Sequence, residues 1–393
     1  MRANTAIIGR VLLEEDIQPP ALGEPVLVSQ PLLPDLDELM PLLQQIWKRK
    51  HVTNHGPLHQ RLEAELQAHL GVDTAMLFNN GTTGLITALK LFDLPPGSEV
   101  ITSPLTFAAT AHAISWNGLK PVFADVSPGT LTVDPEAVAR AITENTSAIL
   151  GVHVYGTLCD IEAFAALGAS RDLRVIYDAA HAFGATKKGV SVGRFGDASV
   201  FSFHATKLFN TLEGGLITTP NAQDRDKIYY LRNFGIKNEE EVVEVGINGK
   251  MNEVQAAIGL LNLRGVEDEK AKRRQLRKRY CEVLAGLEGV QTQPEQPGVE
   301  NSEQYFPLII DETCYGRTRD DIYDALKARN VFARKYFHPI CTDFEPYRHF
   351  PIVSTRAIPH VTEVKSRVLC LPFHSGVSQD AVSVIADVFH SGR

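Results

Sequence analysis

Two residues, Lys207 and Asp178, have the types and positions needed for imine chemistry. Lys207 ends the segment SFHATK (202–207), just past an apolar run, and a Gly-Gly turn follows it. A lysine amine can condense with an aldehyde when its pKa is low enough to leave it neutral. Asp178 ends the run RVIYD (174–178), and a carboxylate there could keep a pyridine nitrogen protonated. Alone, each has an ordinary alternative, a solvated lysine and a turn-capping aspartate. Together they favour pyridoxal chemistry.

The segment NNGTTGL (79–85) could hold a phosphate. Gly81 allows close approach of the backbone, and Thr82 offers a hydroxyl where a helix-like segment begins. Free N–H groups at the start of a helix favour an anion. The segment lacks the lysine of a triphosphate loop, so one small phosphate fits better, and a glycine turn with a helix cap is the alternative. Phe107, in SPLTFAAT, could stack on a flat ring or belong to the core.

Alternating apolar and helix-like segments predict the framework that positions these residues. Leucines recur at every fourth position from Leu58 to Leu70 and predict a helix. Short apolar runs follow at 74–78, 99–103, 121–126, 148–156, 174–178, 198–203 and 215–219. Helix-like segments separate most of them, which predicts an α/β fold with a mostly parallel sheet. In such sheets ligands bind beyond the carboxyl ends of the strands, where the candidate residues fall.

The length of 393 residues exceeds what one hydrophobic core usually organises. We expect an N-terminal arm at 1–25, a large domain at 26–265 and a small C-terminal α+β domain at 266–393. In the small domain we expect a long charged helix at about 264–288, a strand at 305–310, and helices at 318–329 and 378–390.

Composition and charge exclude several other classes of protein. The formal charge of −8 disfavours nucleic-acid binding, and we interpret the basic run KAKRRQLRKR (270–279) as the solvated face of a helix. The five cysteines lack zinc-ligand spacing, which predicts reduced thiols and no metal site. No apolar run approaches the roughly 18 residues that cross a bilayer, and residues 1–20 lack the features of a signal peptide. We expect a cytoplasmic protein without membrane contact.

The order of the motifs is more specific than any one of them. The motifs are NNGTTGL, SPLTFAATAHAI, PVFADV, VHVYG, DAAHAFGA, GDASVFSFHATKLFNTLEGG, RNFGI, GINGKMNEVQAA, RKYFHPI and LCLPFHS. In them the chain resembles the DegT/DnrJ/EryC1/StrS family of sugar aminotransferases, from about residue 25 to the C-terminus. The resemblance implies pyridoxal 5′-phosphate as cofactor and the type I aminotransferase fold. That fold has a mostly parallel seven-stranded central sheet and a smaller C-terminal α+β domain.

The resemblance also implies a role for each candidate residue. Lys207 would form the Schiff base and move a proton between cofactor and substrate, and Asp178 would pair with the pyridine nitrogen. The other implied cofactor contacts are His181 at the ring hydroxyl, Phe107 on the ring, Gly81, Thr82 and Ser202 at the phosphate, and Asn248 at the phosphate of the neighbouring subunit. Because Asn248 would reach the phosphate of the neighbouring subunit, the resemblance also implies a homodimer with shared active sites. The implied substrate contacts are Asn54, Lys250, Tyr336 and His338.

Among such enzymes, the chain most resembles aminotransferases that act at C4 of dTDP-4-keto-6-deoxy-D-glucose and use L-glutamate as donor, giving the 4-amino-4,6-dideoxy sugar. A C3-specific keto-sugar aminotransferase shares much of the pattern, so the carbon and the nucleotide base stay open. A related deoxysugar dehydratase has histidine in place of the lysine, and Lys207 disfavours it. We interpret His204 as a structural imidazole. Intact Lys207, Asp178 and Thr82 also disfavour a non-catalytic regulatory protein on the same fold.

Overall fold

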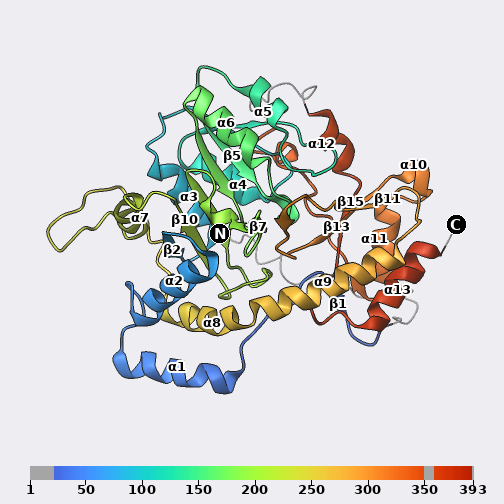
Figure 1. Ribbon diagram of the computed structural model, residues 1–393, viewed down its shortest axis with the longest axis horizontal. Coiled ribbons are helices and arrows are strands. Elements are labelled where there is room, and N and C mark those ends of the chain that lie inside the picture. Colours follow the sequence, from blue (N-terminus) through green and yellow to red (C-terminus); the bar gives the residue numbers. More distant parts are fainter. Residues whose placement is uncertain (1–21, 349–357, 392–393) are drawn as a thin grey trace, which may run out of the picture.

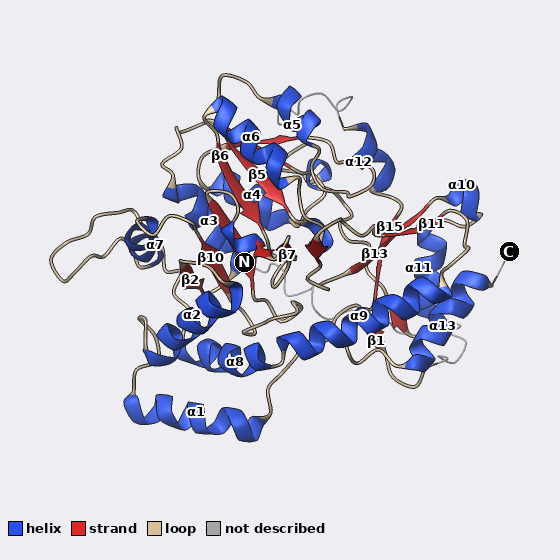
Figure 2. Ribbon diagram, in the orientation of Figure 1, coloured by secondary structure: helices blue, strands red, loops and turns tan. Residues whose placement is uncertain are grey.

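The computed structural model describes residues 22–348 and 358–391, so most of the predicted arm at 1–25 lies outside the described residues. A seven-stranded sheet forms the centre of the larger part of the molecule (Figures 1 and 2). Its strands are β2 (Ala75–Phe78), β3 (Glu99–Thr102), β4 (Lys120–Phe123), β5 (Thr146–Val152), β6 (Arg174–Asp178), β9 (Ala198–Ser202) and β10 (Gly215–Thr218). Each corresponds to one apolar run of the sequence.

The sheet is mostly parallel, as the sequence predicts. Its strand order is β2-β10-β9-β6-β5-β3-β4. Only β10 runs antiparallel to its neighbours β2 and β9, and the other four pairings are parallel. The carboxyl ends of β6 and β9, which carry Asp178 and Ser202, therefore lie at one edge.

Helices cover both faces of this sheet, because successive side chains of each strand point to opposite sides. On β6, Val175 and Tyr177 join one hydrophobic cluster and Ile176 joins the other. The first face is covered by α2 (Pro57–Leu70), α5 (Pro135–Ala141), α6 (Ile161–Arg171) and α8 (Glu253–Arg264). The second is covered by α3 (Gly81–Leu91), α4 (Ala108–Trp116) and α7 (Asp224–Arg232).

Helix α2 shows how local sequence sets an element. Pro57 occupies the first turn, where its missing N–H costs nothing, and Gly71 ends the helix with a φ of 60°. The leucines from Leu58 to Leu70 are buried, which confirms the predicted stripe. Helix α1 (Leu36–Arg49) packs beside α8, and the segment between α7 and α8 projects from the body of the molecule (Figure 1).

The C-terminal part has its own sheet and core. Strands β11 (Val290–Thr292), β13 (Phe306–Ile310) and β15 (Val368–Leu371) form a three-stranded antiparallel sheet. Its helices are α9 (Val266–Val283), α10 (Glu312–Tyr315), α11 (Arg319–Ala328), α12 (Pro359–Val364) and α13 (Gln379–His390). Helices α8 and α9 run almost end to end and link the two parts (Figure 1). The predicted smaller α+β unit is therefore present.

Two small sheets cross the predicted domain limits. Strand β1 (Val26–Leu27) pairs with β14 (Val331–Phe332), so residues 26–27, predicted in the large domain, lie with the C-terminal part. Strand β12 (Val299–Glu300) pairs with β7 (Thr186–Lys187), which also pairs with β8 (Val190–Ser191). We propose to keep the boundary near residue 265, because Gly265 separates α8 from α9. Among the described residues, no helix is long and apolar enough to span a membrane.

Candidate active site

A cavity of about 630 Å³ opens at the carboxyl edge of the central sheet, a size typical of small-molecule sites. Its walls come from the starts of α3 and α4, the ends of β6 and β9, and segments that follow α9 in the chain. The structure brings these sequence-predicted residues together in it: Gly81, Thr82, Phe107, Asp178, His181, Ser202, Lys207 and Tyr336.

The backbone on both sides of Lys207 is held by one buried side chain, Gln304. The side-chain oxygen of Gln304 accepts a hydrogen bond from the N–H of Leu208 at 2.7 Å. Its amide nitrogen donates to the carbonyl of Thr206 at 3.1 Å. Gln304 therefore brackets the lysine and fixes the turn that presents its amine to the cavity.

The Lys207 amine lies in a setting that favours its neutral form. Its Nζ is 5.5 Å from the centre of the Tyr305 ring. Burial lowers the pKa of Lys207 to about 8, although the negative charge of Asp178 opposes this shift. A sizeable fraction of the amine is therefore neutral near physiological pH, as condensation with an aldehyde requires.

Asp178 is buried at the end of β6 and has two hydrogen-bond donors. The hydroxyl of Thr110 donates to Oδ2 at 2.7 Å, and the N–H of Ala180 donates to Oδ1 at 3.1 Å. Burial raises the pKa of Asp178, while these two bonds and the charge of Lys207 act against the rise. A buried carboxylate of this kind favours a cationic partner in the cavity.

His181 and Phe107 present rings to the same cavity. His181 is buried, and its Nδ1 accepts a hydrogen bond from the N–H of Tyr155 at 3.2 Å. Its ring stacks on Phe337 with the centres 5.6 Å apart. Phe107 precedes α4 and is 61% exposed, so its ring faces open space rather than the core. This position fits a ring that stacks on a ligand.

The loop before α3 is shaped for close approach to β9. The side chain of Asn80 caps the helix by accepting from the N–H of Thr83 at 2.8 Å. A Cβ atom at Gly81 would come within 3.0 Å of the Cβ of Ser202, so a larger residue would crowd the space between the loop and the strand. Gly81, Thr82 and Ser202 thus form a small polar cradle at the start of a helix, where an anion is favoured.

The other four sequence-predicted residues lie outside this cavity in the single chain. Asn248 is exposed, and its backbone carbonyl accepts a hydrogen bond from the side-chain amide of Asn79 at 3.2 Å. Lys250 donates to the side chain of Asn233 at 2.8 Å and lines a separate small pocket with Asn54. His338 is exposed and does not line the cavity.

Comparisons with known proteins agree with this geometry. The family model described as DegT/DnrJ/EryC1/StrS aminotransferase family matches residues 35–390. The chain belongs to this family. The chain is similar to the dTDP-4-amino-4,6-dideoxy-D-glucose transaminase of Shigella dysenteriae, with 43% identity over 364 residues, which are 93% of this chain and 98% of the relative. The transaminase of the same name from Escherichia coli is 41% identical over 358 residues, covering 90% and 95% of the two chains.

Solved structures give the same result for the fold. A structure of DesI in the presence of its TDP-sugar product matches with a TM-score of 0.88 and 37% identity, covering 94% of this chain and 93% of that chain. Helicobacter pylori PseC, an aminotransferase involved in the biosynthesis of pseudoaminic acid, matches with a TM-score of 0.85 and 26% identity, covering 93% and 98% of the two chains.

This DegT/DnrJ/EryC1/StrS chain is thus an aminotransferase that uses pyridoxal 5′-phosphate. Its own residues fit the group. The amine of Lys207 and the carboxylate of Asp178 line one cavity, as an aldehyde and a ring nitrogen of one molecule require. The crowded approach of Gly81 to Ser202 leaves a cradle suited to a phosphate.

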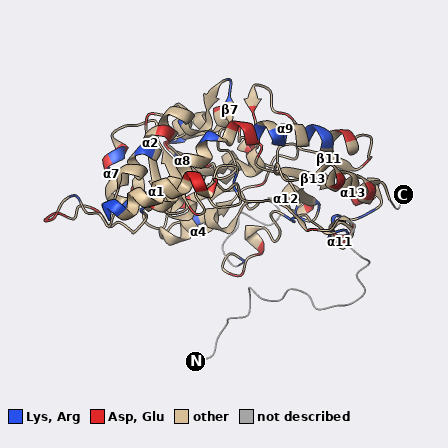
Figure 3. Cartoon of the chain, turned by 90° about the horizontal axis from the view of Figure 1, so that it is seen from below, with Lys and Arg blue, Asp and Glu red and all other residues tan. Residues whose placement is uncertain are grey.

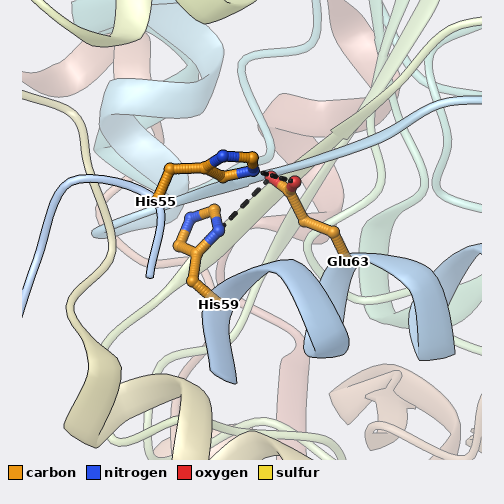
Figure 4. Close-up of side chains that lie close together, drawn as sticks. All are labelled: His55, His59 and Glu63. Atoms are coloured by element: carbon orange, nitrogen blue, oxygen red, sulfur yellow. Dashed lines mark hydrogen bonds and ion pairs between the residues drawn. The ribbon is translucent and has the colours of Figure 1, made fainter. Parts of the chain in front are cut away.

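A second cluster, of His55, His59 and Glu63, lies outside the cavity (Figure 4). Figure 4 shows both imidazole rings turned toward the carboxylate, and the potential metal-ligating atoms lie within 4.8 Å of one another. However, Nη1 of Arg232 is already 2.7 Å from Oε1 of Glu63, and a metal cation there would be repelled. We interpret Glu63 as the partner of Arg232 in a buried ion pair, with His55 and His59 packed beside it, and the absence of a metal site stays a prediction.

Sequence reasoning missed three residues of the site: Tyr305 and Phe337, which line the cavity, and Thr110, which supports Asp178 from outside it. Thr110 contacts Asp178, Tyr305 lies beside Lys207, and Phe337 stacks on His181. The motifs SPLTFAATAHAI and RKYFHPI contain Thr110 and Phe337. Thr110 could have been found as a hydroxyl one helical turn after Thr106, and Phe337 as an aromatic residue next to Tyr336. His204, interpreted as structural, also lines the cavity, where its Nδ1 contacts Oγ1 of Thr206 at 2.8 Å.

Proposed function

We propose that the protein transfers an amino group from L-glutamate to C4 of dTDP-4-keto-6-deoxy-D-glucose, which gives the 4-amino-4,6-dideoxy sugar. The observation that carries this proposal is the identity of 43% and 41% to two dTDP-4-amino-4,6-dideoxy-D-glucose transaminases over at least 90% of the chain. The cavity supports it, because Lys207 and Asp178 are both present there.

Each residue has a distinct task in this proposal. Pyridoxal phosphate, when bound, supplies a ring that stores the electron pair released at the reacting carbon. The Asp178 carboxylate keeps the ring nitrogen protonated, and Phe107 stacks on the ring. Gly81, Thr82 and Ser202 hold the phosphate. The neutral amine of Lys207 accepts the proton from the α-carbon of glutamate. In the second half of the reaction it gives a proton to the sugar carbon that receives the nitrogen.

We further propose a cytoplasmic homodimer with shared active sites. Asn54, Asn248 and Lys250 do not line the Lys207 cavity of their own chain, which leaves them available to a second copy. Apolar surface supports this arrangement: Trp47 on α1 is 67% exposed, and Val245 in the segment between α7 and α8 is 87% exposed.

A visible spectrum tests the cofactor and the lysine. We expect an absorbance band near roughly 410–420 nm for the lysine-bound cofactor, which L-glutamate bleaches. The Lys207→Ala variant should lack both the band and the response. A variant that keeps sugar turnover at the wild-type rate would contradict the role of Lys207.

A panel of nucleotide-linked keto sugars tests the substrate. Each sugar is incubated with L-glutamate, and the product is examined by NMR. We expect an amine at C4 of the 4-keto-6-deoxy sugar. An amine at C3 would favour the C3-specific alternative, and loss of a hydroxyl without nitrogen would favour the dehydratase.

A further inference from the structure

The His181 ring accepts a hydrogen bond at one of its nitrogens. The backbone N–H of Tyr155 donates to Nδ1 at 3.2 Å. An N–H group can only donate, so Nδ1 must present a lone pair. A neutral imidazole has one protonated and one bare nitrogen, and the proton of His181 must then be on Nε2.

The backbone of Tyr155 adopts an unusual conformation, and this conformation directs its N–H toward Nδ1 of His181. Tyr155 has φ of 58° and ψ of 7°, a left-handed conformation that bulky residues rarely adopt. Its hydroxyl donates to the carbonyl of Tyr336 at 2.7 Å, and its ring stacks on Phe337 with centres 5.9 Å apart. These contacts hold the strained conformation in place.

The orientation of the His181 ring is fixed by its neighbours. Phe337 stacks on one face at an interplanar angle of 6°, and Tyr305 meets the ring edge-on with centres 5.0 Å apart. The hydroxyl of Ser302 donates to the carbonyl of His181 at 2.6 Å. A rotation of the ring that took Nδ1 away from the N–H of Tyr155 would have to move these packed groups.

The second ring nitrogen is left for a ligand. Within residues 22–348 and 358–391, Nε2 of His181 has no hydrogen-bond partner, and the ring lines the cavity. Burial, together with the positive charge of Lys207, holds the pKa of His181 well below its usual value. The ring therefore stays neutral at physiological pH.

We propose that the N–H of Tyr155 locks His181 in the tautomer protonated at Nε2, which makes His181 a donor to an anionic aromatic oxygen in the cavity. That the oxygen is the ring hydroxyl of the cofactor rests on the proposed function. Tyr155 is then a positioning residue that acts through His181. A histidine whose tautomer is not fixed could present a bare Nε2 and accept a hydrogen bond from a protonated ring hydroxyl. With its proton fixed on Nε2, His181 can only donate, which favours the deprotonated oxygen.

NMR of the cofactor-free protein labelled with ¹⁵N-histidine tests the lock directly. The His181 signals are assigned by their loss in His181→Gln. We expect a bare-nitrogen shift for Nδ1 and a protonated shift for Nε2, unchanged between about pH 5.5 and 8.5. A protonated Nδ1, or exchange between tautomers in this range, would overturn the proposal.

A matched pair of variants tests the consequence for the ligand. His181→Gln can accept from Tyr155 and still donate into the cavity, whereas His181→Leu can do neither. We expect pyridoxamine 5′-phosphate to bind His181→Gln nearly as well as wild type and His181→Leu about tenfold more weakly or worse. The ring oxygen of the bound molecule should also titrate at higher pH in His181→Leu, which absorbance detects.

Equal dissociation constants and equal titration midpoints for the two variants would overturn the donor role, since a purely structural role would not move the midpoint. The NMR result concerns a protein without cofactor or substrate. It would therefore stand even if the sugar substrate proposed above were wrong, and the two failures can be told apart.

Discussion

At the scale of single residues, the lowered pKa of Lys207 predicts a pH signature. Below a pH of about 8 most of the amine is protonated and cannot attack an aldehyde. We expect the rate at which cofactor-free protein captures pyridoxal phosphate to rise with pH and to level off above about 8. Stopped-flow absorbance follows the capture.

Asp178→Asn provides the matched test of this signature. It removes the charge that raises the pKa of Lys207, so the midpoint of the capture rate should move to lower pH. A wild-type midpoint near the ordinary lysine value of about 10.4 would contradict the assignment.

Thr110 controls the charge state of Asp178 and gives a second prediction. Thr110→Val keeps the shape and loses the hydroxyl that donates to Oδ2. The pKa of Asp178 should rise further, since that bond lowers it. We expect kcat/KM to fall about tenfold or more, with the acid limb of the pH profile moved to higher pH. Thr110→Ser should restore both, and wild-type kinetics in Thr110→Val would argue against the role.

The residues at strand ends were accessible from the sequence, because the parallel sheet brings its carboxyl ends to one edge. Asp178 and Lys207 were placed this way. Thr110 and Gln304 were not, because their contacts join segments far apart in the chain: 68 residues separate Thr110 from Asp178, and 96 separate Gln304 from Leu208. Only the packing of α4 and of the C-terminal part against the sheet creates these contacts.

At the scale of elements, a buried ion pair joins α2, β2 and α7. Oε1 of Glu63 accepts from Nη1 of Arg232 at 2.7 Å and from the N–H of Leu77 at 2.9 Å. Burial alone would raise the pKa of Glu63, but a hydrogen bond from His55 and the charge of Arg232 outweigh it and hold the pKa at about 2. The stabilisation is therefore complete above about pH 4.3, the unfolded value, and is lost as the pH falls toward about 2.

Glu63→Gln should destabilise the fold by about 3–5 kcal/mol, because it leaves the buried Arg232 without its countercharge. Urea denaturation measures the loss. Glu65→Gln on the same helix is the control: its partner Arg61 is exposed, so the change should be within about 1 kcal/mol. Equal stability of the two variants would show that the buried pair contributes little.

The basic run at 270–279 does not form the fully solvated helix face that its sequence pattern predicts. The interpretation as a solvated face is wrong for Lys270 and Arg273, which are buried. Lys270 contacts Glu300 at 3.1 Å, and Arg273 pairs with Glu269 at 2.7 Å, one turn earlier. Figure 3 shows acidic residues followed by basic ones along α9. The acidic partner on β12 lies 30 residues away from Lys270, so periodicity within the helix could not reveal it.

At the scale of the whole molecule, the proposed homodimer with shared sites predicts complementation between subunits. If the proposal holds, Lys207→Ala and Asn248→Ala chains that are unfolded and refolded together would form heterodimers with one intact site. We expect each variant alone to lose most activity and the mixture to regain about a quarter of wild-type activity. Recovery no greater than the mean of the two variants would contradict shared sites.

The two-part architecture was predictable because the helix and strand patterns change after residue 251, and the structure has a sheet on either side of that change. The pairing of β1 with β14 was not predictable. Each strand has two residues, and they are separated by about 300 residues of chain. Such a short pairing leaves no periodic signal, and only the docking of the two parts makes it form.

Transfer of nitrogen from glutamate to sugar tests the central claim most directly. The purified protein with pyridoxal phosphate is given ¹⁵N-L-glutamate and dTDP-4-keto-6-deoxy-D-glucose, and the products are analysed by mass spectrometry and NMR. We predict 2-oxoglutarate and a nucleotide sugar with ¹⁵N bonded to C4, and neither product with Lys207→Ala. A sugar that reacts without gaining ¹⁵N, or one aminated equally well by Lys207→Ala, would contradict the account.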